Sequence, residues 1–168
     1  MKRAILILSV LFSLPMRGMT QSATDPNEGA RLFQDTANTY TFKWWGRAGR
    51  TYFIQTSSDL FSWLYLNEIE SGQNLIIPYG VGTTTGKFFL RLRYSDIATS
   101  NPATADFDGD GLSNAAELLM GTDPLLADSD GDGMSDGNEF LIGSNPVLAD
   151  SPYDGSDRLL EVHTPLAP

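Results

Sequence analysis

A repeat of 22 residues in the C-terminal part of the chain constrains the fold more than any other feature. The segments NPATAD, DPLLAD and NPVLAD begin at residues 101, 123 and 145. Self-similarity at a fixed period is typical of arrays in which each unit packs mainly on its sequence neighbours. Residues 101–168 are therefore interpreted as such an array, separate from the preceding part of the chain.

The first two copies each contain a loop in which carboxylates alternate with other residues around a glycine. In DFDGDGLSNAAE the acids occupy positions one, three, five and twelve, and DSDGDGMSDGNE has a further acid at position nine. This is the spacing of EF-hand-like calcium loops, in which side-chain oxygens and the carbonyl of position seven surround the ion. We predict two Ca²⁺ sites. Their ligands are Asp106, Asp108, Asp110, Leu112, Asn114 and Glu117 in loop one, and Asp128, Asp130, Asp132, Met134, Asp136 and Glu139 in loop two.

Loop two carries more charge than loop one, because Asp136 occupies the position that Asn114 has in loop one. Ligand charge is one of the quantities that set calcium affinity. We therefore predict that loop two binds Ca²⁺ more tightly than loop one.

The third copy, DSPYDGSDRLLE, has lost part of the pattern. Asp150, Asp154 and Glu161 remain in register. Pro152 replaces the second carboxylate, however, and Arg158 places a cation at position nine. A third metal site is not expected, and the copy is interpreted as a cap, since terminal repeats are usually atypical.

A short apolar segment follows each loop and is interpreted as a helix. Asn114 and Asp136 are suitable N-caps, with a glutamate three residues later, and Gly121 and Gly143 mark the ends. Helices of about six residues are well below the ~12–15 residues needed for marginal stability in water. Metal binding is therefore expected to supply the order of this region, so that binding and folding are coupled.

Residues 30–95 have the pattern of β-strands rich in Thr, Tyr, Phe, Ile and Trp. The strand candidates cover residues 39–45, 50–57, 63–70, 74–79 and 87–94. Such runs, bounded by Gly, Ser and Asp, are typical of an antiparallel sandwich or a small barrel. We predict a mainly β fold, in which a small antiparallel β-sandwich domain precedes the calcium-bound array of loops and short helices.

Thirteen of the eighteen aromatic residues lie between Tyr40 and Tyr94. We interpret them as core residues rather than as a platform for sugar rings. Trp44 and Trp45 are adjacent, so that they point to opposite faces of a strand. The one that faces outward is the only candidate for a ligand surface in this region.

The N-terminus has the layout of a secretory signal over residues 1–23, with the cations of MKR before an apolar run from Ala4 to Leu14. That run is too short to span a bilayer as a helix. The chain has no cysteine, which excludes disulfides as a reinforcement. We predict a secreted protein, extracellular or at the cell surface, without a transmembrane segment once the signal is removed.

The excess negative charge is confined to the C-terminal part. Residues 101–168 contain fourteen acidic residues and one basic residue, Arg158. Such a field attracts cations and repels nucleic acids and anionic membranes. Calcium ions are expected as partners and nucleic acids are not.

Residues 101–161 resemble the thrombospondin type 3 repeat in its bacterial form. The resemblance is carried by DSDGDG, by the apolar Leu112 and Met134 at loop position seven, and by the turn of the form G-[TS]-[DN]-P. It implies a calcium-wrapped array with little hydrophobic core. A paired EF-hand is excluded, because Gly121 and Pro124 leave no room for a helix entering loop two. Dockerins usually have an apolar residue at position eight, which is serine in both loops.

The segment GRTYFIQTSSDLFSW resembles a short β-module of exported bacterial proteins, which implies an architecture and no activity. The only histidine, His163, lies near the C-terminus, and Asp59, Glu68 and Glu70 form no recognisable acid–base pair. We therefore predict a non-enzymatic, secreted calcium-binding structural or adhesion module, with an extracellular glycan or a cell-surface protein as its partner. The alternatives are a dockerin-like assembly module that binds a cohesin-type partner, and a carbohydrate-binding accessory domain.

Overall fold

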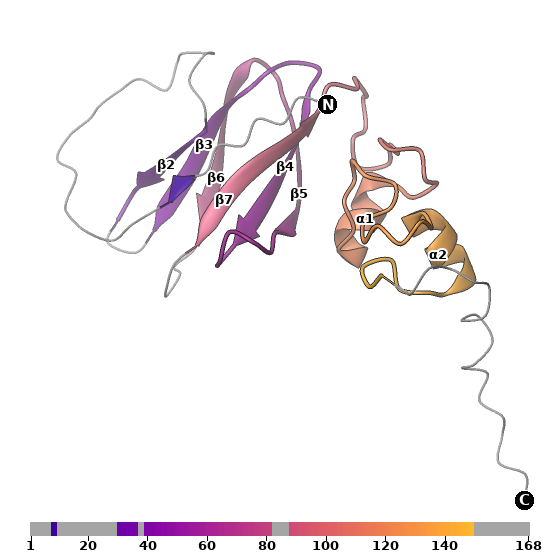
Figure 1. Ribbon diagram of the computed structural model, residues 1–168. Coiled ribbons are helices and arrows are strands. Elements are labelled where there is room, and N and C mark those ends of the chain that lie inside the picture. The colour runs from indigo at the N-terminus through magenta and orange to yellow at the C-terminus, as the bar shows by residue number, and fades with distance from the viewer. Residues whose placement is uncertain (1–7, 10–29, 37–38, 82–87, 150–168) are drawn as a thin grey trace, which may run out of the picture. The chain divides into compact units, whose positions relative to one another are not determined.

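The computed structural model describes residues 8–9, 30–36, 39–81 and 88–149 (Figure 1). They belong to two compact units, Met1–Pro102 and Ala103–Pro168. Apart from Leu8 and Ser9, the predicted signal peptide lies outside the described residues, and so do the degenerate third copy and His163. No helix in the described part of the chain is long and apolar enough to cross a membrane.

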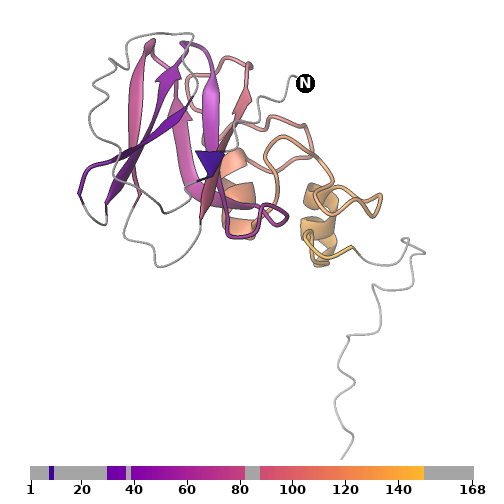
Figure 2. The same cartoon turned by 60° about the vertical axis from the view of Figure 1, so that its left-hand side comes forward.

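The first unit consists of two antiparallel sheets, and the predicted mainly β fold is confirmed (Figures 1 and 2). One sheet has the order β1-β7-β4-β5 and the other β2-β3-β6, so that the described strands form no closed barrel. The strands are β1 (Leu8–Ser9), β2 (Arg31–Gln34), β3 (Tyr40–Gly46), β4 (Thr51–Ser57), β5 (Leu64–Ser71), β6 (Leu75–Val81) and β7 (Phe89–Ser95).

All five predicted strands are present, each within two residues of its expected bounds. Strand β2 was not predicted, because four residues are too few to show an alternating pattern. Strand β1, which pairs with β7 from inside the predicted signal, was not predicted either. Removal of that signal would leave β7 at the edge of its sheet.

Both sheets contribute to one hydrophobic core. Phe42 and Trp44 of β3 pack in the same cluster as Tyr52 and Ile54 of β4. The rings of Trp44 and Tyr52 lie with their centroids 5.9 Å apart. Trp45 is only half-buried, as expected for the opposite face of β3. The aromatic residues of this cluster therefore fill the core.

The SSDLFSW part of the β-module pattern forms a tight turn between β4 and β5. Ser57 Oγ accepts hydrogen bonds from the amides of Asp59 and Leu60, at 3.2 and 2.8 Å. Asp59 Oδ1 accepts from the amides of Phe61 and Ser62, at 2.8 and 2.9 Å. These bonds lower the pKa of the Asp59 carboxyl. The motif is explained by this turn, without any ligand.

The second unit contains two seven-residue helices, α1 (Asn114–Met120) and α2 (Asp136–Ile142), each preceded by an acidic loop. Gly121 and Gly143 end the helices with positive φ angles of 88° and 82°, as the sequence predicts.

The predicted N-caps are wrong by one residue. Ser113 and Ser135 cap the helices, and their hydroxyls accept from the amides of Ala116 and Asn138. The serines have the extended backbone that an N-cap needs, whereas Asn114 and Asp136 are already helical. The glutamates are consequently four residues after the cap and form no capping box.

Candidate metal centres

The side chain of Asp106 organises the first loop. Its two carboxylate oxygens accept hydrogen bonds from the amides of Gly109 and Gly111, at 2.6 and 3.0 Å. Both glycines have positive φ angles, 83° and 100°, which other residues rarely adopt. Glycines at these two positions therefore allow the chain to fold back around the first carboxylate of the loop.

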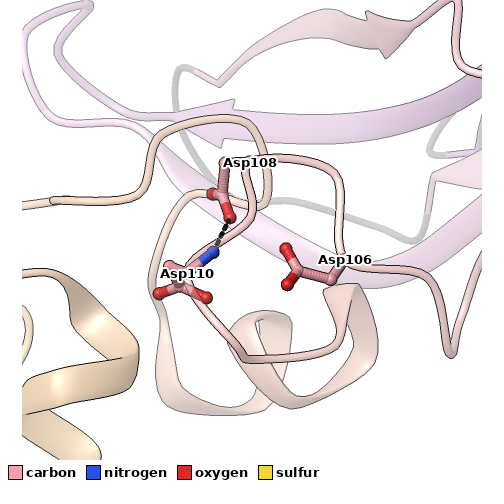
Figure 3. Close-up of side chains that lie close together, drawn as sticks. All are labelled: Asp106, Asp108 and Asp110. Atoms are coloured by element: carbon pink, nitrogen blue, oxygen red, sulfur yellow. Dashed lines mark hydrogen bonds between the residues drawn. The ribbon is translucent and has the colours of Figure 1, made fainter.

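Asp108 and Asp110 complete an acidic triplet with Asp106 (Figure 3). Asp108 Oδ1 accepts from the amide of Asp110 at 3.4 Å, and Asp110 Oδ1 accepts from the amide of Leu112 at 2.8 Å. One oxygen of each of the three carboxylates lies within 4.8 Å of the others. Three negative groups at this separation can hold a cation between them.

The second loop repeats this geometry bond for bond. Asp128 accepts from Gly131 and Gly133 at 2.7 and 3.0 Å, and Asp130 accepts from Asp132 at 3.1 Å. The amide of Met134 then donates to Asp132 at 2.8 Å. Asp128, Asp130 and Asp132 form the second triplet within the same 4.8 Å limit. Every bond joins residues two, three or five apart, so the local sequence alone specifies the loop.

The two glutamates at position twelve are buried. Glu117 and Glu139 have exposed fractions of 0% and 1%. Neither oxygen of Glu117 has a hydrogen-bond partner among the described residues, and the same holds for Glu139 Oε2, Asp108 Oδ2 and Asp130 Oδ2. Burying carboxylate oxygens without hydrogen-bond partners lowers the stability of the fold by on the order of several kcal/mol. A divalent cation would satisfy them, so the residues present fit a metal ion.

Electrostatics point the same way. Burial, followed by the charges of Asp108 and Asp110, raises the pKa of the Glu117 carboxyl to about 9. Burial and the charge of Asp130 raise the pKa of Glu139 to about 7. Burial and neighbouring aspartates also raise the pKa of Asp108, to about 6. Without a cation Glu117 therefore retains its proton at neutral pH, and Glu139 and Asp108 take up protons more readily than ordinary carboxyls, because ionising these groups places like charges together in a desolvated site.

Calcium affinity should therefore rise with pH, and the two loops should differ. The raised pKa values of Glu117, about 9, and Glu139, about 7, mean that a cation must displace a proton from each at lower pH. Affinity should fall about tenfold for each pH unit below the pKa of the competing group. Loop two should reach its full affinity near neutral pH, while loop one continues to gain toward alkaline pH.

Calcium titrations across this pH range, with both loops resolved, test the difference. Equal pH profiles for the two loops would contradict it.

In the ion-free protein the same raised pKa values make the stability of the repeats fall with rising pH, whereas calcium affinity rises with pH. The folded repeats then bind more protons than the unfolded chain, so their stability is greatest below the unfolded glutamate pKa. It falls as pH rises through about 7 and about 9, the folded values of Glu139 and Glu117.

Position nine has a different environment from the triplets. Asn114 and Asp136 are completely buried. The two oxygens of Asp136 accept hydrogen bonds from the amide and the hydroxyl of Ser129, at 2.9 and 2.7 Å. These bonds still leave lone pairs on the carboxylate. That Asn114, Asp136 and the carbonyls of Leu112 and Met134 are ligands stays a prediction.

Two residues that were not predicted, Ser129 and Gly137, hold parts of these loops in place. Ser129 holds Asp136 and also accepts from the amide of Asp123 at 2.7 Å. Gly137 approaches the first loop, and its amide donates to Asp110. Ser129 carried no signal in the sequence, whereas Gly137 stands where the first repeat has Ala115.

Two segments of the second unit match a known family of protein repeats. Residues 106–127 and 128–149 each match the family model for the bacterial TSP3 repeat. These matches cover 44 of the 168 residues, and the two segments are similar to bacterial TSP3 repeats. The predicted resemblance is confirmed, with repeats that begin at the first acidic position rather than at residues 101 and 123. No curated protein and no solved structure matches the chain.

Each TSP3 repeat thus contains one acidic triplet, one buried glutamate and one short helix. The triplets can hold metal ions, and calcium is consistent with this repeat family.

Proposed function

We propose that this protein is a secreted, non-enzymatic structural module in which two Ca²⁺ ions order an acidic TSP3 array attached to a β-domain over residues 30–95. The observation that supports it best is the set of buried carboxylate oxygens without partners at Glu117 and Glu139. Each glutamate would close the shell of an ion that its aspartate triplet and position seven begin. Bound calcium would supply positive charge where the carboxylates converge, which are four in loop one and five in loop two.

The small hydrophobic core of the repeats supports this structural role. Among the described residues of the second unit, the large aliphatic side chains that are buried are Leu112, Leu118 and Leu125. Leu119 and Leu141, which correspond in the two helices, are 75% and 80% exposed. So small a core cannot offset the conformational entropy of ordering the chain. Metal binding would contribute the missing free energy.

A role in attachment outside the cell follows from the predicted signal and from the acidic array. We propose that the partner is an extracellular glycan or a cell-surface protein and that the β-domain binds it. A screen of residues 24–168 against glycans and surface proteins, with and without calcium, tests this role. Binding to neither class would leave a calcium-ordered spacer and overturn the adhesion part of the proposal.

The calcium sites are tested by titration calorimetry on the full chain. We expect two binding events, and we expect Glu139→Gln to weaken loop two by about 100-fold, since loss of even supporting groups costs 10–100-fold at metal sites. Loop one should still bind. Glu68→Gln, in an exposed position of β5, is the matched control and should leave both events in place. Two unchanged events in Glu139→Gln would show that the closing ligand is wrongly assigned.

A further inference from the structure

The second repeat makes a direct hydrogen bond to a predicted ligand of the first. The amide of Gly137, in the first turn of α2, donates to Asp110 Oδ2 at 2.7 Å. The other oxygen of Asp110 accepts from the amide of Leu112 within its own loop, at 2.8 Å. The orientation of this carboxylate is therefore set partly by loop one and partly by the repeat that follows it.

Only glycine allows this contact. A Cβ atom on Gly137 would lie 2.1 Å from the carbonyl oxygen of Asp110 and 3.0 Å from its carbonyl carbon. These are backbone atoms, so no flexible side chain can move aside. The φ angle of Gly137 is not in the left-handed region, so close approach is the reason for glycine at this position.

The first repeat uses the same position differently. Ala115 corresponds to Gly137, and its amide donates to the carbonyl of Ala103 at 3.0 Å, within the entry to its own repeat. In the third copy the corresponding residue is Leu159. Of the two repeats that the structure describes, the one with a glycine at this position is the one that contacts the acidic loop of the preceding repeat.

The position of Gly137 depends on loop two. Asp136, its neighbour, is completely buried and bonded through both oxygens to Ser129, the second residue of loop two. The amide of Asp136 also donates to the carbonyl of Ala127 at 2.9 Å. When loop two is ordered, these bonds hold the first turn of α2 in place. When it is not, these bonds are lost, and Gly137 is held less firmly against Asp110.

We propose that Gly137 is a positioning residue for the first calcium site, and that its contact with Asp110 couples the two sites. This inference rests on the proposed function. Coupling between sites is reciprocal in free energy. Because loop two carries the additional ligand charge of Asp136, we expect it to bind calcium first. Loop one then binds when loop two is already occupied, so that the coupling changes the affinity measured for loop one.

The test is a calcium titration of the full chain followed by NMR. The amide signals of Gly111 and Gly133, which bond to the first aspartate of their own loops, report the two sites separately. Gly137→Ala should lower the affinity of loop one about tenfold, within the usual range of coupling between sites. Loop two should change by less than about twofold, although alanine favours a helix more than glycine does.

Asn138→Ala is the matched control, because Asn138 is exposed in the same turn and its capping bond uses the backbone amide. It should leave both affinities unchanged. Glu139→Gln empties loop two by another route and should lower the affinity of loop one by a similar factor. Combining it with Gly137→Ala should add little, because both changes remove the same coupling.

Three results would overturn the inference. They are an unchanged loop-one affinity in Gly137→Ala, an unchanged loop-one affinity in Glu139→Gln, and equal weakening of both loops by Gly137→Ala. Should Gly137→Ala fail to fold, the Glu139→Gln result decides. Failure of the proposed function is distinct, since the unaltered chain would then show no shift of either glycine signal with millimolar calcium.

Discussion

Removal of calcium should unfold residues 103–149 and leave the sheets of the first unit folded. This segment has ten acidic residues and no basic residue, and three carboxylates of each loop lie within 4.8 Å of one another. Without cations the repulsion among them opposes the compact state. A site held at about 1,000 times its Kd contributes about 4 kcal/mol to stability. Loss of two such sites exceeds what the small core of the repeats can offset.

Hydrogen exchange on the full chain measures this effect. In excess EDTA the amides of α1 and α2 should lose protection, whereas those of β3 and β4 should keep it. EDTA already saturated with calcium is the control and should change nothing. Equal protection of α1 and α2 with and without calcium would contradict coupled folding.

Glu117→Gln should abolish the first site more completely than Glu139→Gln abolishes the second. Both oxygens of Glu117 lack a hydrogen-bond partner in the described structure, whereas one oxygen of Glu139 accepts from Ser144 Oγ at 3.2 Å. Glutamine keeps the shape of the side chain but offers one neutral oxygen in place of a bidentate carboxylate. We expect the affinity of loop one to fall by at least about 100-fold, the upper end of what supporting groups contribute.

The ion-free repeats should respond to Glu117→Gln in the opposite sense. The pKa of Glu117, raised to about 9, shows how unfavourable its charge is there without a cation. At neutral pH a neutral amide replaces a carboxyl that is already protonated in the ion-free form, so this form should be no less stable than in the unaltered chain. Calorimetry gives the affinity, and circular dichroism in EDTA compares the helix that remains in the variant with that in the unaltered chain. A variant that has less helix than the unaltered chain in EDTA and still binds two ions would refute the assignment.

The loops were predictable because their geometry is local. Asp106 bonds to the amides three and five residues later, and Asp128 does the same 22 residues further on. Gly109 and Gly111, whose amides donate to Asp106, have positive φ angles, which glycine adopts readily. The strands were predictable for a similar reason, since alternation in β3 places Phe42 and Trp44 on one face.

Errors arose where two local solutions compete. Serine and asparagine or aspartate are comparable N-caps, and the choice between Ser113 and Asn114 depends on which residue has extended backbone angles. In β2, four residues gave no pattern, and its pairing with β3 identifies it as a strand.

The sequence by itself determined the two acidic loops, their glycine turns and the C-terminal ends of the helices, because each depends on contacts within about five residues. Only the tertiary structure decided that Glu117 and Glu139 are buried with oxygens left without partners, and that Gly137 contacts Asp110. The physical reason is distance along the chain. Gly137 and Asp110 are 27 residues apart, and no local pattern specifies which surfaces two neighbouring repeats bring together.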